Sequence, residues 1–172
     1  MGNRNLLIVG AGVYGVVAAE IASDMKCFDR IDFIDDFRTT SADGKRVIGN
    51  LEKLEELSSS YGKIVVAIGS ASKRRENIEK IENNTSLEIV SLISPRAYVS
   101  PASKIEKGCI IEPMAVIHTN CVISKGCIVS AGAVINHFSK CLEYVHIDCN
   151  ATIEGGSVVP SEMKVPSGEV FK

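Results

Sequence analysis

The chain has 172 residues, and its 19 Lys and Arg against 21 Asp and Glu give a net charge of −2. This length allows one large domain or two compact ones, and the charges are scattered without a basic stripe, which argues against a nucleic-acid partner. No stretch approaches the ~18 consecutive apolar residues that a membrane span needs. The first apolar run leads straight into a glycine motif, unlike a signal peptide, so we expect a cytoplasmic protein with no membrane partner.

A strand, a glycine turn and a helix open the predicted structure. Residues 5–9 are aliphatic, the turn GAGVYG follows at 10–15, and residues 16–22 space their apolar side chains as a helix does. Glycines have no Cβ, so backbone N–H groups can approach a phosphate at the helix N-terminus, where the helix dipole favours negative charge. We therefore expect Gly10, Gly12 and Gly15 to line a nucleotide site.

The next elements extend this into a parallel sheet. A second strand over 31–34 ends at Asp35 and Asp36, about where a ribose-binding acid sits in dinucleotide folds. A third strand over 63–68, a helix over 71–82 and a fourth strand over 87–92 complete the alternation. The glycines could instead serve packing alone and the aspartates merely end a strand, but the order of all three features favours nucleotide binding. Room for about four strands, rather than six, favours a nucleotide-sugar over NAD.

The second half of the chain is a repeat with a period of six. Every sixth residue is apolar or Cys, and the residue two positions earlier is nearly always small, which predicts alternating large and small side chains in a narrow interior. Three residues after the apolar position, Gly or Asn recurs where the chain must turn. The apolar positions are Val99, Ile105, Ile111, Ile117, Ile123, Val129, Ile135, Cys141, Ile147, Ile153, Val159, Val165 and Phe171.

The repeat also accounts for most of the six cysteines. Cys109, Cys121 and Cys127 occupy the small inward positions, so we interpret them as core residues. The sequence contains no CxxC pair, and we expect neither a metal site nor a disulfide framework.

The hexad tail resembles the left-handed β-helix acyltransferases, and the whole chain resembles the bacterial NeuD/PglD-type sugar acetyltransferases. The matching stretches are IVGAGVYG (8–15), FIDD (33–36), AIG (67–69), ISPRAYVSPA (93–102) and VINHFSKCLEYVH (134–146). This resemblance implies a short Rossmann-like α/β domain over 1–93 that binds a nucleotide-sugar, followed by a left-handed parallel β-helix over 94–172 that carries the acyltransferase site.

The resemblance also implies roles for particular residues. His137 would be the catalytic base, and His146, Asn136 and Gly155 would contact acetyl-CoA, the co-substrate. The acceptor would be the amine or hydroxyl of an activated sugar, often UDP-linked, and the sequence leaves open both the sugar and the choice between N- and O-acetylation. The residues expected to hold the nucleotide-sugar are Gly10, Gly12, Tyr14, Gly15, Asp35, Asp36, Ile68 and Gly69, with Tyr14 standing where the family usually has His.

The hexad register bears on the two histidines independently. Neither falls in an inward row, and nine residues are half of an 18-residue coil, so His137 and His146 should lie on opposite sides of one prism. They could share a site only across a subunit boundary, which fits the homotrimer with one site per interface that the resemblance implies. The third histidine, His118, is expected to be an ordinary surface residue.

Two rival functions stay open. Family members commonly place Glu or Asp after the catalytic His, whereas this chain has Phe138, so that Asn136, Glu143 or a backbone carbonyl would have to orient the ring. That substitution, with a short tail after the repeat, allows a non-catalytic nucleotide-sugar-binding or scaffold trimer. An NAD-linked oxidoreductase rests on the glycine turn alone.

Overall fold

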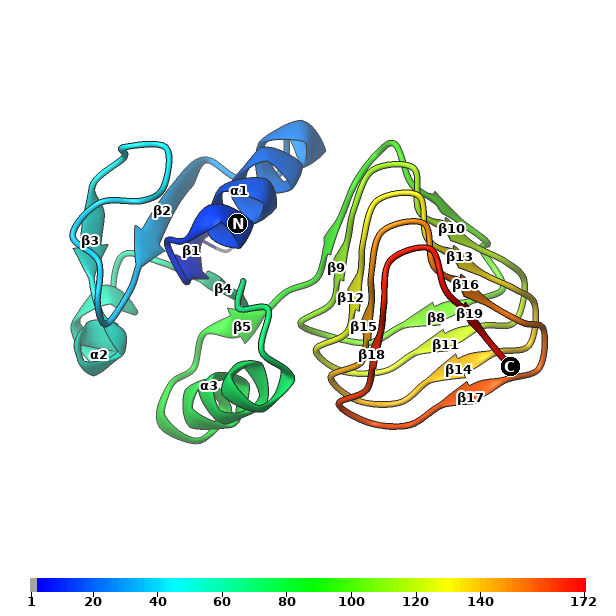
Figure 1. Ribbon diagram of the computed structural model, residues 1–172. Coiled ribbons are helices and arrows are strands. Elements are labelled where there is room, and N and C mark those ends of the chain that lie inside the picture. Colours follow the sequence, from blue (N-terminus) through cyan, green and yellow to red (C-terminus); the bar gives the residue numbers. More distant parts are fainter. Residues whose placement is uncertain (1–2) are drawn as a thin grey trace. The chain divides into compact units, whose positions relative to one another are not determined.

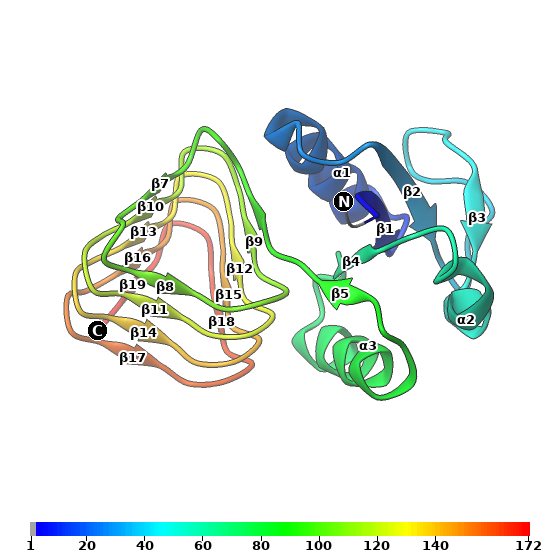
Figure 2. The same cartoon turned by 180° about the vertical axis from the view of Figure 1, so that it is seen from behind.

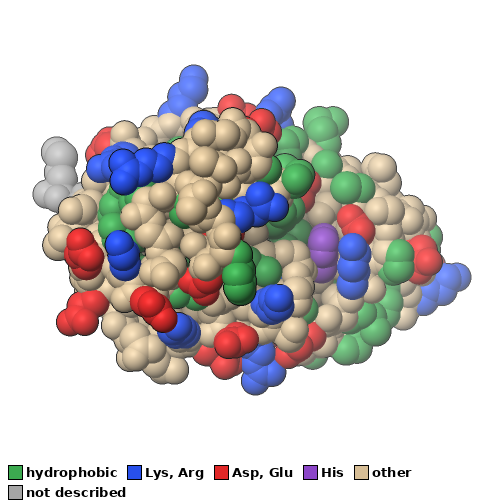
Figure 3. Space-filling view, turned by 60° about the vertical axis from the view of Figure 1, so that its left-hand side comes forward, with side chains coloured by type: hydrophobic (Ala, Val, Ile, Leu, Met, Phe, Trp, Pro, Cys, Tyr) green, Lys and Arg blue, Asp and Glu red, His purple; other side chains and the backbone are tan. Residues whose placement is uncertain are grey.

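The computed structural model describes residues 3–172, which divide into two compact units that meet between Val90 and Ser91. The first unit is an α/β domain and the second a three-sided coil of short strands (Figure 1). None of the helices in residues 3–172 is both long and apolar enough to cross a bilayer. On the face drawn in Figure 3, acidic and basic side chains are interspersed.

The first unit is built on a five-stranded parallel sheet in the order β3-β2-β1-β4-β5. Leu6, Leu7 and Ile8 of the central strand are fully buried, which agrees with their place in a continuous aliphatic run. The elements are β1 (Asn5–Val9), α1 (Val13–Met25), β2 (Arg30–Ile34), β3 (Val47–Gly49), the 3-10 turn η1 (Leu51–Lys53), α2 (Leu54–Leu57), β4 (Lys63–Val66), α3 (Ala71–Asn84) and β5 (Glu88–Ile89).

This sheet differs from the predicted one in two places. Strand β3 is a fifth strand that the sequence did not reveal, because two apolar residues followed by a glycine give no alternating pattern. The predicted strand over 87–92 is in fact two strands: β5 pairs with β4, whereas β6 (Leu92–Ile93) pairs with β9 (Ile110–Ile111) of the second unit. One apolar run thus supplies an edge to each unit.

The second unit winds as a left-handed β-helix, so the predicted fold class is confirmed. Each strand pairs with the strand 18 residues away, as Val116 does with Val134 and with Tyr98. The three resulting sheets have the orders β19-β16-β13-β10-β7, β17-β14-β11-β8 and β18-β15-β12-β9-β6. Figure 2 shows the three flat sides of this unit from behind.

All strands of the β-helix are two residues long. They are β6 (Leu92–Ile93), β7 (Tyr98–Val99), β8 (Lys104–Ile105), β9 (Ile110–Ile111), β10 (Val116–Ile117), β11 (Val122–Ile123), β12 (Ile128–Val129), β13 (Val134–Ile135), β14 (Lys140–Cys141), β15 (His146–Ile147), β16 (Thr152–Ile153), β17 (Val158–Val159), β18 (Lys164–Val165) and β19 (Val170–Phe171). The predicted inward row is buried from Ile111 to Val165, and its end members Val99, Ile105 and Phe171 pack partly buried against the same core.

The corners adopt the left-handed backbone conformation that the Gly and Asn pattern predicted. Positive φ angles recur every six residues from Gly108 to Gly168. Four residues that are neither Gly nor Asn share this conformation: Met114, Phe138, Tyr144 and Glu162. Phe138 has a φ of 60° and directly follows His137, so the chain bends sharply beside the predicted base.

Candidate functional site

A cleft of about 510 Å³ opens at the carboxyl ends of β1, β2 and β4. Strands β1 and β4 are neighbours at the point where the sheet order reverses, which is where open α/β sheets bind their ligands. The cleft brings together seven of the eight residues predicted to hold the nucleotide-sugar, namely Gly10, Gly12, Tyr14, Asp35, Asp36, Ile68 and Gly69.

The eighth residue, Gly15, serves packing. A Cβ atom on Gly15 would lie 2.0 Å from the carbonyl oxygen of Gly10, so only glycine lets α1 approach the end of β1 this closely. Gly10 has a φ of 103°, and its Cβ would lie 2.9 Å from the carbonyl oxygen of Ala67. The glycine turn therefore fixes the position of the N-terminus of α1 against the cleft.

Both aspartates at the end of β2 hold backbone in place. Asp35 Oδ2 accepts the N–H of Ala11 at 2.8 Å, and Oδ1 accepts the N–H groups of Phe37 at 2.9 Å and Arg38 at 3.0 Å. Asp36 Oδ1 accepts the N–H of Leu51 at 3.0 Å. The two carboxylates thus shape the wall of the cleft, and direct contact with a ribose stays a prediction.

Sequence reasoning missed the residue that shapes the opposite wall. Arg74 in α3 is fully buried, and its guanidinium donates to the carbonyl oxygens of Ile68 at 2.8 Å and Gly69 at 3.0 Å. A buried charge needs such partners. In a helix rich in exposed charges, nothing in the sequence distinguishes Arg74 from Arg75. Other lining residues that were not predicted include Phe37, Arg38, Lys73 and Asn77.

His137 lies exposed at the corner that follows β13. Its imidazole stands against Gly155 one coil further along, where a Cβ atom would be 2.7 Å from Cε1 and 3.1 Å from Nδ1. The carbonyl of His137 accepts the N–H of Gly156 at 2.9 Å, which fixes the backbone at this corner. Phe138 presents its ring roughly edge-on, with the two ring centroids 5.9 Å apart. The imidazole is therefore held from two sides and open to solvent.

The two other residues predicted to contact acetyl-CoA near this corner are Asn136 and Gly155. The side-chain amide of Asn136 donates to the carbonyl oxygen of Ile153 at 3.0 Å and so supports the adjoining coil. Glu143, a candidate for orienting the imidazole, lies at the next corner of the same chain, after β14. His118 lies one coil before Asn136 and is partly buried.

His146 belongs to β15, on another sheet of the prism. Its side chain is only 13% exposed, and Nε2 lies 3.1 Å from Oγ of Ser130 and 4.0 Å from Oδ1 of Asp148. Lys164 binds Asp148 at 2.8 Å, and this hydrogen bond holds the pKa of Asp148 at about 2. A carboxylate therefore faces His146 at neutral pH.

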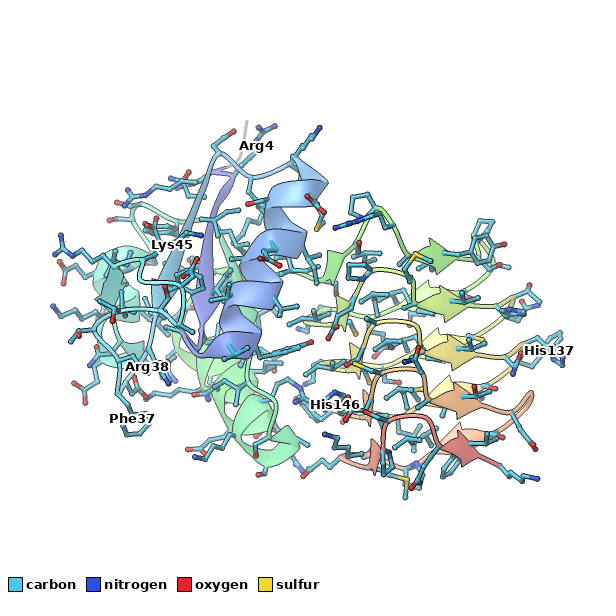
Figure 4. All side chains as sticks on the ribbon, turned by 45° about the horizontal axis from the view of Figure 1, so that its top comes forward. Arg4, Phe37, Arg38, Lys45, His137 and His146 are labelled. Carbon is cyan, nitrogen blue, oxygen red and sulfur yellow. The ribbon has the colours of Figure 1, made fainter. Side chains whose placement is uncertain are left out.

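The structure separates the two histidines. His137 and His146 point away from opposite sides of the β-helix (Figure 4), as the half-coil spacing predicted. Within one chain, Asn136 and Gly155 accompany His137 and not His146. Any site that uses both imidazoles requires a second copy of the chain.

Four of the six cysteines lie in the core of the β-helix. Cys109, Cys121, Cys127 and Cys141 are buried, and all six cysteines are free thiols. Burial raises the pKa of Cys121 and that of Cys141, the latter to about 12, while a hydrogen bond to Cys109 and burial raise the pKa of Cys127. These thiols are poor nucleophiles. Residues 3–172 contain no cluster of three or more potential metal ligands.

Comparisons with known proteins agree with both units. Residues 5–81 match the PglD N-terminal domain family. The acetyltransferase domain of PglB from Neisseria gonorrhoeae is 26% identical, with a TM-score of 0.74 and coverage of 99% of this chain and 92% of that one. PerB from Caulobacter crescentus, solved with CoA and GDP-perosamine, is 19% identical, with a TM-score of 0.74 and coverage of 98% and 88%. The search of curated proteins found no match.

A Rossmann-like domain with a cleft at its switch point, joined to a left-handed β-helix with an exposed histidine at one corner, defines a two-part acyltransferase of the hexapeptide-repeat class. Within that class, the match of residues 5–81 to the PglD N-terminal domain family and the likeness to the PglB acetyltransferase domain along nearly the whole chain support a sugar acetyltransferase of the NeuD/PglD type. The resemblance stated from the sequence is thereby confirmed.

Proposed function

We propose that this chain transfers the acetyl group of acetyl-CoA to the amine or hydroxyl of a nucleotide-linked sugar in the cytoplasm, with His137 as general base at a trimer interface. The PglB domain was also solved with acetyl coenzyme A, and it is 24% identical to this chain in that structure. The perosamine N-acetyltransferase from Caulobacter crescentus was solved with CoA and GDP-perosamine in two variants. In both variants one histidine of that protein is replaced, by asparagine in one and by alanine in the other.

The observation that carries the proposal is the position of the His137 side chain and the contacts around it. The imidazole is exposed at a corner, its backbone is hydrogen bonded to Gly156, and the absence of a side chain on Gly155 leaves room for the ring. A base must reach the proton that it removes, and its orientation must be fixed for transfer to be efficient. The imidazole of His137 is accessible, and its contacts with Gly155 and Phe138 restrict its orientation, which supports this role.

The chemistry then needs little else from the chain. As the sugar amine or hydroxyl attacks the thioester carbonyl, His137 accepts its proton, the carbon–sulfur bond breaks, and the proton can pass to the departing CoA sulfur. A backbone N–H or the second imidazole would stabilise the developing oxyanion. No acyl-enzyme is required, which agrees with the raised pKa values of the buried cysteines.

The separation of the two imidazoles supports an assembly of more than one subunit, and we propose a trimer. A head-to-tail cyclic assembly would bring the His137 corner of one subunit to the His146 face of the next, giving one site per interface. Large apolar side chains are exposed on the β-helix, including Met114, Phe138, Leu142 and Val158. Such side chains are what a subunit interface would cover.

The cleft of the first unit would hold the nucleotide part of the acceptor. Its glycine turn and the N-terminus of α1 suit a diphosphate, and Arg38 and Lys73 add positive charge. The residues that line the cleft do not distinguish uracil from guanine, so a panel that contains both UDP- and GDP-linked amino sugars is the appropriate test. NAD should not bind, because the unit has one strand fewer than a full dinucleotide fold.

The test is release of free CoA from acetyl-CoA in the presence of UDP- and GDP-linked amino and hydroxy sugars. We expect turnover with one class of acceptor, a loss of about 100-fold or more in His137→Ala, and little change in His118→Ala. Sedimentation should show a trimer for all three proteins. Acceptor-independent CoA release, or full turnover by a monomer, would contradict the proposal.

The second candidate function is a non-catalytic nucleotide-sugar-binding or scaffold trimer. The observation in its favour is Phe138, which stands where a carboxylate would orient the imidazole. This function predicts nucleotide-sugar binding and trimer formation without CoA release, so the same assay separates it from the first.

A further inference from the structure

We propose that Phe37 is the platform on which the base of the bound nucleotide stacks, and that this contact supplies much of the affinity for the nucleotide. The inference deepens the proposed function and rests on it, because it assumes that the cleft holds a nucleoside diphosphate. The inference places the nucleobase at one side of the cleft, beside the loop that follows β2.

Phe37 contributes almost nothing to the packing of its own domain. The side chain is 93% exposed, the largest exposure among the large hydrophobic residues of the described chain, and yet it lines the cleft. In Figure 4 it projects from its loop beside Arg38, away from the sheet. An aromatic ring exposed at the rim of a ligand cleft is costly for the folded chain and useful for a planar ligand.

The backbone of this loop is held in place before any ligand binds. Asp35 Oδ1 accepts the N–H groups of both Phe37 and Arg38, and Oδ2 accepts the N–H of Ala11 in the glycine turn. One carboxylate therefore ties the aromatic platform to the turn expected to hold the phosphates. The loop loses less backbone freedom on binding, because much of its order already exists.

The sheet order brings the two parts of the ligand site side by side. The glycine turn follows β1 and the Phe37 loop follows β2, and these strands pair in register as far as Val9 and Ile34. A diphosphate at the glycine turn would place the attached nucleoside within reach of the β2 side. Both oxygens of Asp35 already accept backbone hydrogen bonds, so the residues available to the nucleoside on this side are Asp36 and the Phe37 loop that follows it.

Stacking also fits the chemistry of the loop. Every nucleobase has a π-face, so a phenyl ring can bind uracil and guanine without reading their edges. Arg38 adds a cation whose planar group stacks readily on an aromatic ring or pairs with phosphate. The ligand class is thus a nucleoside diphosphate, attached to a sugar, whose base is held by its face.

The test measures affinity for UDP, GDP and inorganic pyrophosphate by calorimetry on the full chain. We expect Phe37→Ala to raise the Kd for UDP and GDP by about 5- to 150-fold. Phe37→Tyr, which keeps the ring, should restore binding to within about threefold. The affinity for pyrophosphate, which has no base, should be equal in all variants. Tyr98→Ala, which removes an exposed aromatic side chain of the β-helix, is the matched control and should bind as the wild type does.

Several results would overturn the inference. Unchanged UDP and GDP affinity in Phe37→Ala would refute stacking, and an equal loss for pyrophosphate would show that the loop had merely misfolded. Absence of nucleotide binding by the wild type would also refute it. The proposed function is judged separately by CoA release, where stacking predicts a raised KM and an unchanged kcat for Phe37→Ala. If Phe37→Ala turns over with an unaltered KM, the acetyltransferase function is supported and stacking on Phe37 is refuted.

Discussion

Gly155 lies against the imidazole of His137 so closely that a methyl group could not fit between them. A Cβ atom at Gly155 would stand 2.7 Å from Cε1 and 3.2 Å from Nε2 of His137, and the first distance is shorter than real carbon contacts. The two residues are one coil apart, so the regular winding of the β-helix brings them together. A glycine at this point of the repeat is therefore a condition for the orientation of the histidine.

The first prediction follows from this contact. Gly155→Ala should push the imidazole out of its position and lower kcat by about 100-fold, since a displacement of about 1 Å can cost that much. Thermal stability should change little, because the ring is exposed and can swing into solvent. The measurement is CoA release together with the melting temperature.

A double variant isolates the cause of that loss. If Gly155→Ala acts through His137, adding it to His137→Ala should produce no further decrease in turnover. Additive losses would show that the alanine blocks substrate directly.

The second prediction concerns the buried guanidinium of Arg74. Arg74→Met should destabilise the first unit by about 3 kcal/mol, because it leaves the carbonyl oxygens of Ile68 and Gly69 without their charged donor. The cleft wall should also deform, which weakens nucleotide binding. Urea unfolding and calorimetry with UDP and GDP measure the two effects.

Its neighbour on the same helix supplies the control. Arg75 is half exposed and pairs with Glu79 four residues away. Arg75→Met should cost no more than about 0.5 kcal/mol and leave nucleotide binding intact. Equal effects of the two substitutions would contradict the role assigned to Arg74.

The architecture could be predicted because the sequence of each unit contains a pattern typical of its fold. The inward row from Ile111 to Val165 repeats every six residues, and the glycine turn stands between an aliphatic run and a helical one. Strand β3 was missed because it is short and partly exposed, and its pairing with β2 is decided by tertiary contacts.

The site was predictable only where a backbone constraint fixes the residue type. The glycines of the turn at 10–15 could be found from the sequence, whereas Gly155 was predicted only to contact acetyl-CoA and its contact with His137 appears in the structure. The roles of Asp35 as a backbone acceptor and Arg74 as a buried donor depend on which carbonyl and amide groups fold against them. No local pattern encodes those partners, and Phe37 becomes notable only once its exposure is known.

The third prediction concerns the pH dependence of stability at Asp148. The hydrogen bond from Lys164 lowers the pKa of this carboxyl from 3.8 to about 2, so the folded state favours the ionised form. The stabilisation is therefore complete above about pH 4 and is lost as the pH falls toward 2. Lys164→Met should lower the stability at pH 7, and the difference from the wild type should shrink below pH 4.

Urea unfolding at a series of pH values measures this difference. Lys172→Met, which removes an exposed pair with Glu154, is the control and should behave as the wild type does. A difference between Lys164→Met and the wild type that stays constant from pH 7 to pH 3 would contradict the assignment to Asp148.

The last prediction separates stability from activity at Phe138. Its φ of 60° is unfavourable for a residue with a side chain, and most of its ring is exposed. Phe138→Gly should therefore stabilise the β-helix by about 0.5–1 kcal/mol while lowering turnover, because the edge contact with His137 disappears. Met114→Gly is the matched control, since Met114 is exposed, has a φ of 64° and lies at a different corner. It should give the same gain in stability with unchanged turnover. If Phe138→Gly keeps full activity, the phenyl ring has no part in holding the imidazole, and Gly155 with the hydrogen-bonded backbone is sufficient.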